Sequence, residues 1–259
     1  MTESCPNEFI ALADRLAEAA RPVIRKYFRT PVAVDDKDDA SPVTIADREV
    51  EAEMRTLIRA AFPDHGILGE EHGAENMEAE YVWVLDPIDG TKAFITGKPS
   101  FGTLIALTRK GRPILGIIDQ AILGERWLGA AGHPTTLNGQ PARVRECDEL
   151  AKAYAYTTGP EFFDAATLPA WNRIAARVKQ PRYGCDCYAY ALLASGFVDL
   201  VVEAGLKPYD FAALVPVIEN AGGIATDWAG KPLTIHSDGR VCAAGDARLH
   251  AKALEVLAG

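Results

Sequence analysis

The stretch Val82–Gly97, VWVLDPIDGTKAFITG, is the most informative part of the chain, because an apolar run in it ends in two acids. Residues Tyr81–Leu85 are β-branched, aromatic and aliphatic, which predicts a buried strand. Pro87 fixes its own φ and disfavours the α region for Asp86, so the chain leaves the strand in one direction. The pattern therefore places the carboxylates of Asp86 and Asp89 together at the end of a strand.

These two carboxylates, with the Ile88 carbonyl between them, suit a hard divalent cation such as Mg²⁺, which takes oxygen ligands together with water and substrate phosphate. Gly90 allows a close approach of the backbone, and Thr91–Ile95 can begin a helix whose N–H groups face an anion. The motif thus indicates a metal and a phosphate in one corner. The alternative is a polar turn, since Asp-Pro and Asp-Gly are both common turn pairs.

Two further acids lie near the ends of predicted elements. Glu70, in the sequence Gly-Glu-Glu, follows a short apolar run at 66–68, so its carboxylate could reach the same metals from a neighbouring strand. The alternative is a solvated loop. Asp210 follows Pro208 and precedes an apolar run at 214–218, where it could also serve as a helix N-cap. Capping and metal binding do not exclude one another.

Taken together, Glu70 in GEE, the DPIDGT motif that begins at Asp86, and Asp210 in YDxxA resemble the motifs of the inositol monophosphatase family. The members of that family are Mg²⁺-dependent, lithium-sensitive phosphatases, and the usual last motif is WDxxA. The resemblance covers nearly the whole chain, from the helix before Asp47 to Gly245-Asp246. It implies an α/β (α+β) chain with the layered αβαβα sugar-phosphatase fold and a site between two halves.

Within this family the chain is most similar to bacterial-type histidinol-phosphate phosphatases. The strings that carry this finer resemblance are KAFITG at 92–97, FGTLIAL at 101–107, YGCDCYAY at 183–190 and DLVVEAGLKPYD at 199–210. Inositol-type members usually have Thr-Asn-Phe after DGT and Trp-Asp in the last motif, where this chain has Lys92-Ala93-Phe94 and Tyr209-Asp210. The departure favours a different substrate and the same reaction.

The resemblance implies roles for the residues at matching positions. The implied ligands of two or three Mg²⁺ ions are Glu70, Asp86, the Ile88 carbonyl, Asp89 and Asp210. Thr91, with Asp47 or Glu70, would orient and deprotonate the attacking water, while the N–H groups of Gly90 and Thr91 hold phosphate. Direct attack by water is expected, because no Ser-His-Asp constellation or Cys phosphatase loop is present. For Asp47 the alternative is a capping box with Thr44.

Substrate choice is expected to come from residues of the second half. Glu203 matches the family position that contacts the non-phosphate part of the substrate, and with Asp186 it would favour a cation such as histidinol. Asp210 is expected to contact the substrate as well as the metal. Tyr188 or Tyr190 could stack on the imidazole of histidinol. The alternatives are an exposed strand-end acid for Glu203, a helix cap for Asp186 and core packing for the tyrosines.

The length and charge of the chain limit its partners. The 259 residues predict one compact unit with two halves, 1–150 carrying Glu70 and the DPIDGT motif, and 151–259 carrying Asp210 and the substrate-side residues. A net charge of −9 argues against nucleic acid or an anionic membrane as partner. A small phosphate monoester is still compatible, because it meets the local charge of metals. The family resemblance also implies a homodimer.

The cysteines indicate a reducing compartment. They are five in number and scattered, at Cys5, Cys147, Cys185, Cys187 and Cys242. The start of the chain is acidic and amphipathic, without a basic region followed by an apolar core, so we expect a cytoplasmic protein. Cys185-x-Cys187 could suggest zinc, but it lacks a second pair at finger spacing.

Periodicity and turn residues predict the remaining elements. Helices are expected at 7–28 with a kink at Pro22, from about Thr44, and at 160–178, 187–195, 211–220 and 246–257. Strands are expected at 101–107, 113–119 and 125–130 as an antiparallel region, and at 153–157, 200–203 and 241–244. An acidic loop is expected at 35–39, with turns at 110–111 and 132–134.

The leading hypothesis is a Mg²⁺-dependent histidinol-phosphate phosphatase, which converts L-histidinol phosphate and water to L-histidinol and phosphate in histidine biosynthesis. The alternative enzyme is an inositol-1-monophosphatase or broad-specificity sugar phosphatase with the same site. A third reading is a metal- or phosphate-binding protein without turnover. The intact candidate acids and Thr91 argue against it.

Overall fold

Strand β5 (Tyr81–Asp89) lies inside the larger of two main sheets in the computed structural model, which describes residues 4–31, 34–36 and 42–259. It pairs in parallel with β3 (Gly66–Gly69) and antiparallel with β6 (Gly102–Arg109). The strand is longer than the predicted Tyr81–Leu85. It continues through Asp86 to Asp89, with a shift in its register against β6 between these two acids.

The larger sheet has the strand order β10-β9-β8-β7-β6-β5-β3-β4. Its other strands are β4 (Gly73–Glu75), β7 (Arg112–Gln120), β8 (Glu125–Ala130), β9 (His133–Leu137) and β10 (Gln140–Pro141). The predicted antiparallel region is confirmed, because β6, β7 and β8 pair antiparallel in sequence. The predicted turn at 132–134 is too long, because β9 already begins at His133.

The smaller sheet has the order β12-β11-β13-β15-β14. Its strands are β11 (Tyr154–Thr157), β12 (Gln180–Tyr183), β13 (Leu200–Glu203), β14 (Ile224–Thr226) and β15 (Val241–Ala244). A separate pair is formed by β1 (Val34–Asp36) and β2 (Pro42–Thr44). The first residues of the predicted acidic loop, 35 and 36, therefore belong to a strand, and 37–39 lie outside the described residues.

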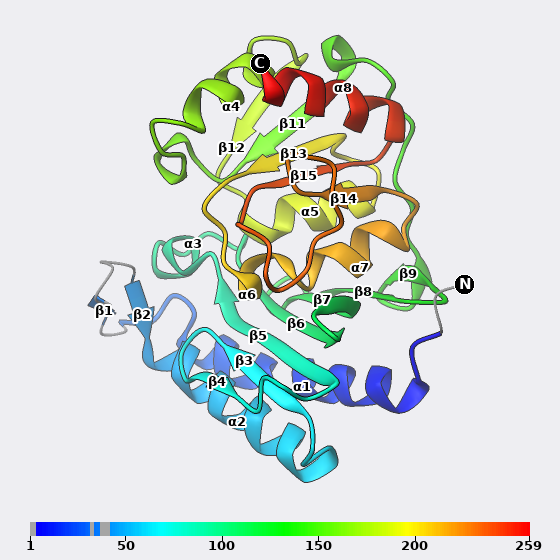
Figure 1. Ribbon diagram of the computed structural model, residues 1–259. Coiled ribbons are helices and arrows are strands. Elements are labelled where there is room, and N and C mark those ends of the chain that lie inside the picture. The colour runs from blue at the N-terminus through cyan, green and yellow to red at the C-terminus, as the bar shows by residue number, and fades with distance from the viewer. Residues whose placement is uncertain (1–3, 32–33, 37–41) are drawn as a thin grey trace.

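The helices complete five layers, which Figure 1 shows from bottom to top. The helices are α1 (Asn7–Tyr27), α2 (Ile45–Ala61), α3 (Thr91–Ile95), α4 (Leu168–Ala175), α5 (Asp186–Ala194), α6 (Pro208–Phe211), α7 (Leu214–Glu219) and α8 (Ala247–Ala258), with 3-10 turns at Leu150–Lys152 (η1) and Pro160–Phe162 (η2). Helices α1 and α2 cover one face of the larger sheet, α5 and α7 lie between the sheets, and α4 and α8 cover the smaller sheet. The predicted layered αβαβα architecture is confirmed.

Three hydrophobic cores fill the spaces between the layers. The apolar residues of α1 recur every three to four positions, as at Phe9, Leu12 and Leu16, and they pack with α2 against the larger sheet. The second core lies between the two sheets and the third under α4 and α8. The main sheets fall within 66–141 and 154–244, and helices from beyond residue 151 pack on the first sheet. The division into halves at residue 150 stays a prediction.

Two of the predicted helices are interrupted. The segment 160–178 contains η2 and then α4, because the Asp164 carboxylate accepts the N–H groups of Ala166 and Thr167 and turns the chain between them. The segment 211–220 begins three residues early, at Pro208, whose fixed φ suits a first helical turn, and it divides into α6 and α7. Strands β12 and β14 were not predicted.

Helix α7 lies directly on two glycines of the larger sheet. A Cβ at Gly116 on β7 would overlap the carbonyl oxygen of Ala213, and one at Gly129 on β8 would overlap that of Pro216. The absence of side chains at these positions lets the helix approach the strands. The approach also fixes where the chain before α7, including Asp210, sits above the sheet.

We expect Gly116→Ala to lower the free energy of unfolding by about 2 kcal/mol, since overpacking against backbone forces a shift of the helix. Urea unfolding measures the change. Gly124→Ala is the matched control, because space around Gly124 is open and its positive φ alone is strained. Equal losses in the two variants would contradict the steric explanation.

Candidate active site

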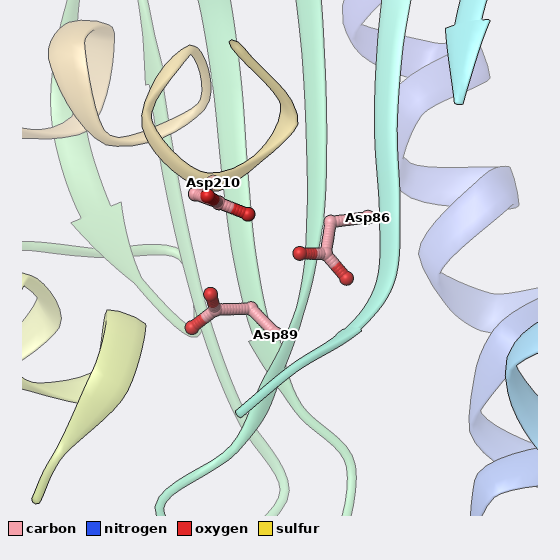
Figure 2. Close-up of side chains that lie close together, drawn as sticks. All are labelled: Asp86, Asp89 and Asp210. Atoms are coloured by element: carbon pink, nitrogen blue, oxygen red, sulfur yellow. The ribbon is translucent and has the colours of Figure 1, made fainter. Parts of the chain in front are cut away.

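Three carboxylates from two distant parts of the chain meet beside the end of β5. One oxygen of each of Asp86, Asp89 and Asp210 lies within 4.8 Å of the others. Figure 2 shows Asp86 and Asp89 on β5 and Asp210 on the turn of α6 beside them. The structure therefore brings together the two acids of the DPIDGT motif and the acid of the YDxxA motif, as the sequence predicted.

Backbone N–H groups hold each of these carboxylates in place. Asp86 Oδ1 accepts from the Ile88 N–H at 3.0 Å, which fixes the turn at Pro87. Asp89 Oδ2 accepts from the Cys187 N–H at the start of α5 at 2.6 Å, and Asp210 Oδ2 accepts from the Lys207 N–H at 2.6 Å. Each carboxylate is thus oriented by a backbone N–H group close to it in the fold.

The position of Asp210 differs from the predicted helix N-cap. The N-cap of α6 is Lys207, and Asp210 is the third residue of the helix, from which its side chain reaches back to the Lys207 N–H. The prediction that Asp210 itself is the N-cap is therefore wrong. Its carboxylate nevertheless lies in the acidic cluster.

Burial and mutual repulsion act on the acids of the cluster. Burial raises the pKa of Asp86 well above its ordinary value, and the charges of Glu70, Asp89 and Asp210 raise it further. Burial also raises the pKa of Asp89, with the charges of Asp186 and Asp210 adding to the effect. A divalent cation would relieve this repulsion, and the all-carboxylate donor set fits a hard ion such as Mg²⁺.

Glu70 reaches the same corner from the neighbouring strand. It follows β3, and its N–H donates to the Leu85 carbonyl at 3.2 Å, which continues the pairing of β3 with β5. The predicted neighbouring strand is thus confirmed. The Glu70 side chain lines the same cavity as the three aspartates, and its charge acts on Asp86 and on Asp47.

Helix α3 begins at the bottom of this corner. Gly90, its N-cap, has a φ of 86°, and a Cβ there would collide with the Asp186 side chain, so glycine is required. The Thr91 hydroxyl donates to the Ile88 carbonyl at 3.1 Å, so two predicted site residues are in direct contact. Gly90 and Thr91 both border the cavity, as a phosphate-binding role requires.

Asp47 lies behind the cavity, in the first turn of α2. Its Oδ2 accepts from the Thr44 N–H at 2.9 Å, and Thr44 caps the helix, so the capping box is confirmed. Its Oδ1 is buried without a hydrogen-bond partner among the described residues. Burial raises the pKa of Asp47 to about 6, and the charge of Glu70 adds to this shift.

A cavity of about 250 Å³ extends from the carboxylates toward the second half of the chain. Its lining comprises Glu70, Asp86, Ile88, Asp89, Gly90, Thr91, Lys92, Thr158, Phe162, Asp186, Glu203, Ala204, Gly205, Leu206, Lys207, Tyr209 and Asp210. The predicted metal, phosphate and acidic substrate-side residues therefore share one cavity. A phosphate bound beside the carboxylates and Gly90 would place the rest of its ester against β13, η2 and α6.

Glu203, at the end of β13, is buried with 1% of its surface exposed. Its carboxylate accepts from the Thr158 N–H at 2.6 Å, the Thr158 hydroxyl at 2.9 Å and the Thr157 hydroxyl at 3.1 Å. Burial nevertheless raises its pKa to about 7, against the effect of these bonds. The alternative of an exposed strand-end acid is wrong.

Asp186 is the first residue of α5, and the N-cap is Cys185, so the helix-cap alternative for Asp186 is also wrong. Its backbone has a φ of 47°, which is uncommon for a residue with a side chain. Burial raises its pKa to about 6, while the charges of Lys98 and Lys92 oppose the shift. The charges of two lysines therefore act on this acid, and one of them, Lys92, lines the cavity.

The structure does not bring the two predicted tyrosines to the cavity lining. The Tyr188 hydroxyl donates to Glu125 at 2.6 Å and its ring packs edge-on against Trp127, while Tyr190 is 2% exposed in the core. Core packing is therefore the better interpretation of both. The aromatic residues that do line the cavity are Phe162 and Tyr209.

Sequence reasoning missed Phe162 and the lysines Lys92 and Lys207 as site residues. Phe162 follows Gly159-Pro160 shortly after β11, the strand that pairs with β13. Residues just beyond the end of a strand adjacent to the one carrying Glu203 could have been identified as candidates.

No helix in the described part of the chain has the length and apolar character needed to cross a membrane.

Comparisons with known proteins agree with this geometry. The model of the inositol monophosphatase family matches residues 6–258. The chain is 56% identical to the bifunctional phosphatase IMPL2, chloroplastic, of Arabidopsis thaliana, over 97% of this chain and 75% of that protein. It is 36% identical to a histidinol-phosphatase of Chlorobaculum parvum, over 90% of this chain and 91% of the relative.

A solved structure described as an inositol monophosphatase from Zymomonas mobilis has a TM-score of 0.91 and 47% identity, and covers 99% of this chain and 100% of its own. The family depends on metal ions, usually Mg²⁺, which the acidic cluster described above would suit. The predicted family and fold are thus confirmed. With all three kinds of comparison in agreement, this chain belongs to the inositol monophosphatase family and is a phosphomonoesterase.

Proposed function

We propose that the protein is a Mg²⁺-dependent histidinol-phosphate phosphatase that acts in histidine biosynthesis. The observation that carries the proposal is the pair of acids, Glu203 and Asp186, in the same cavity as the carboxylate cluster. L-histidinol phosphate has an ammonium group on the carbon next to its phosphate-bearing CH₂ and an imidazole at the far end, and inositol phosphate has neither. A buried carboxylate favours the cationic ester through a charge-assisted hydrogen bond.

The names of relatives support this substrate class. Histidinol-phosphatases of Chlorobaculum parvum and Mycobacterium tuberculosis are 36% and 34% identical to this chain. The specific alternative is an inositol monophosphatase, which is supported by the high similarity to the Zymomonas mobilis structure of that description. Both functions would use one phosphate corner and differ only in the pocket for the alcohol.

We assign the metal ligands to the acids that line the phosphate corner. Asp86, Asp89 and Asp210 would hold the ions, with Glu70 and the Ile88 carbonyl as further oxygen ligands. Mg²⁺ bound there would neutralise the phosphoryl oxygens and favour deprotonation of the attacking water. This requires no covalent enzyme intermediate.

The protein's own groups then position water and phosphate. The Thr91 hydroxyl donates its proton to the Ile88 carbonyl, so its oxygen can accept a hydrogen bond from the attacking water. Glu70, which lines the cavity, would take the water proton. Asp47 does not line the cavity, so we assign it a positioning role through the charge of Glu70. The N–H groups of Gly90 and Thr91 would hold the phosphate.

Several predictions from the sequence concern properties beyond the site. The number of Mg²⁺ ions, the homodimeric state and the cytoplasmic location stay predictions. A small-molecule phosphate monoester as substrate is consistent with the family and with the size of the cavity.

The test is phosphate release from L-histidinol phosphate and from inositol 1-phosphate, measured side by side with Mg²⁺ and with EDTA. We expect Mg²⁺-dependent turnover with a kcat/KM at least about tenfold higher for histidinol phosphate, the value of one charge-assisted hydrogen bond. A preference for inositol 1-phosphate would retain the metal mechanism and reject the proposed substrate. Turnover that persists in EDTA would reject the metal assignment.

A further inference from the structure

Phe162 lies at the wall of the cavity and is not part of a core. It ends η2, and 39% of its surface is exposed, although it is a large apolar residue. The same residue also borders a second hollow, which Ala204, Gly205 and Arg240 help to line. Phe162 therefore borders two hollows. Such a position explains its exposure without a role in packing.

The face of the Phe162 ring already holds a cation. The Lys92 Nζ lies 4.6 Å from the ring centroid, within the range of a cation–π interaction. Lys92 belongs to α3 in the first half of the chain and η2 belongs to the second half, and both residues line the cavity. The contact thus joins α3 to η2 at the edge of the cavity.

The charges around this ring favour a second cation. The buried Glu203 carboxylate accepts hydrogen bonds from the hydroxyl and N–H groups of two threonines. The charges of Lys92 and Lys98 act on the pKa of Asp186. A cationic ester that enters the cavity would find these carboxylates and the Phe162 ring in its lining. Lys92 would compete with it for the ring, because two cations repel each other.

We propose that Phe162 is a specificity-determining residue, whose ring face stacks on the imidazole end of the substrate, a flat cation when protonated, in the place that the Lys92 ammonium takes in this structure. The inference deepens the proposed histidinol-phosphate phosphatase function and rests on it for the identity of the substrate. Lys92 acts in the opposite sense and lowers the preference for cations. Phe162 binds the alcohol end of the ester, so it affects KM and leaves kcat nearly unchanged.

The first test compares selectivity, defined as kcat/KM for L-histidinol phosphate divided by kcat/KM for inositol 1-phosphate. This ratio cancels effects on the shared phosphate corner. We expect Phe162→Ala to lower the ratio about tenfold, through a higher KM for the cationic ester, since a desolvated cation–π contact is worth up to about 2 kcal/mol. We expect Lys92→Met to raise the ratio about threefold, the size of a partly exposed charge effect.

The second test needs no turnover of histidinol phosphate. L-histidinol is measured as a competitive inhibitor of the hydrolysis of p-nitrophenyl phosphate, with myo-inositol as the neutral comparison. Phe162→Ala should raise the inhibition constant of L-histidinol about tenfold and leave that of myo-inositol nearly unchanged. If the wild-type enzyme prefers inositol 1-phosphate, the proposed substrate fails, and this arm still tests the role of Phe162.

Matched variants separate the aromatic face from mere bulk. Phe162→Leu keeps an apolar side chain without a π face and should behave like Phe162→Ala, whereas Phe162→Tyr should keep the wild-type selectivity. Phe197→Ala removes another exposed ring, 65% exposed and outside this cavity, and should change neither constant. Urea unfolding confirms that each variant is folded. Equal losses on the cationic and neutral compounds, or full selectivity in Phe162→Leu, would overturn the inference.

Discussion

Asp89→Asn is expected to lower kcat by about three orders of magnitude at saturating substrate, because a metal ligand contributes several kcal/mol to stabilisation of the transition state. Asparagine can still accept the Cys187 N–H through its carbonyl oxygen, so the start of α5 stays in place. Phosphate release in a titration with Mg²⁺ measures the effect. Near-normal turnover at low Mg²⁺ would contradict the ligand assignment.

The same variant should be at least as stable as the wild type without metal. The pKa of Asp89 is raised above its ordinary value of 3.8 by burial and by neighbouring acids, so its ionised form costs stability in the fold. This cost is absent below the ordinary pKa of 3.8 and grows as pH rises above it, so the advantage of Asp89→Asn should increase from pH 4 upward. Thermal unfolding of EDTA-treated protein across this range measures it.

Mg²⁺ should reverse the order of stability. A ligand at 100 times its Kd stabilises the fold by about 2.7 kcal/mol, and Asp89→Asn should lose most of this gain. Asp227→Asn is a suitable control, because Asp227 also accepts backbone N–H groups, from Ala229 and Lys231, but does not line the cavity. A full Mg²⁺-induced shift of the melting temperature in Asp89→Asn would be incompatible with a metal at this carboxylate.

Glu203→Gln is expected to lower kcat/KM for L-histidinol phosphate about 100-fold, the value of a strong charge-assisted hydrogen bond, with little change for inositol 1-phosphate. Glutamine is preferable to alanine here. The Thr157 hydroxyl and the Thr158 N–H and hydroxyl would lose their acceptor in Glu203→Ala, and the pocket would be damaged for every substrate. An equal loss on both esters would remove the proposed role of Glu203.

The pH dependence gives an independent test of this acid. Because the pKa of Glu203 is raised to about 7, the ionised carboxylate that pairs with an ammonium group becomes populated as pH rises through 7. Selectivity for histidinol phosphate over inositol 1-phosphate should therefore increase from pH 6 to pH 8 in the wild type. The increase should be absent in Glu203→Gln, which has no titrating group at this position.

The layers and the acidic corner were predictable because local signals are strong there. The run at Tyr81–Leu85, the Pro87 turn and the capping box of Thr44 and Asp47 each fix short-range geometry. The alcohol side of the cavity was harder to predict. Phe162 reaches it through a 3-10 turn, and periodicity could not separate that turn from α4, because the interruption depends on the side-chain hydrogen bonds of Asp164.

The tyrosines show a different limit of sequence reasoning. Tyr188 and Tyr190 lie close in sequence to Asp186, which does line the cavity, yet the direction of α5 turns them toward the packed interior between the sheets. Tyr188 finds its partner in Glu125, 63 residues away. Tertiary contacts of this kind decide which face of a short helix points to a site, and no local pattern contains them.

The carboxylate cluster draws its members from chain positions 86, 89 and 210, on either side of the second sheet's first three strands. During synthesis from the N-terminus, the first two aspartates leave the ribosome well before the third. A nascent chain that ends before α6 therefore holds only part of the cluster. Under the proposed ligand assignment, a metal ion bound by all three acids would require that the segment carrying Asp210 has already docked against β5.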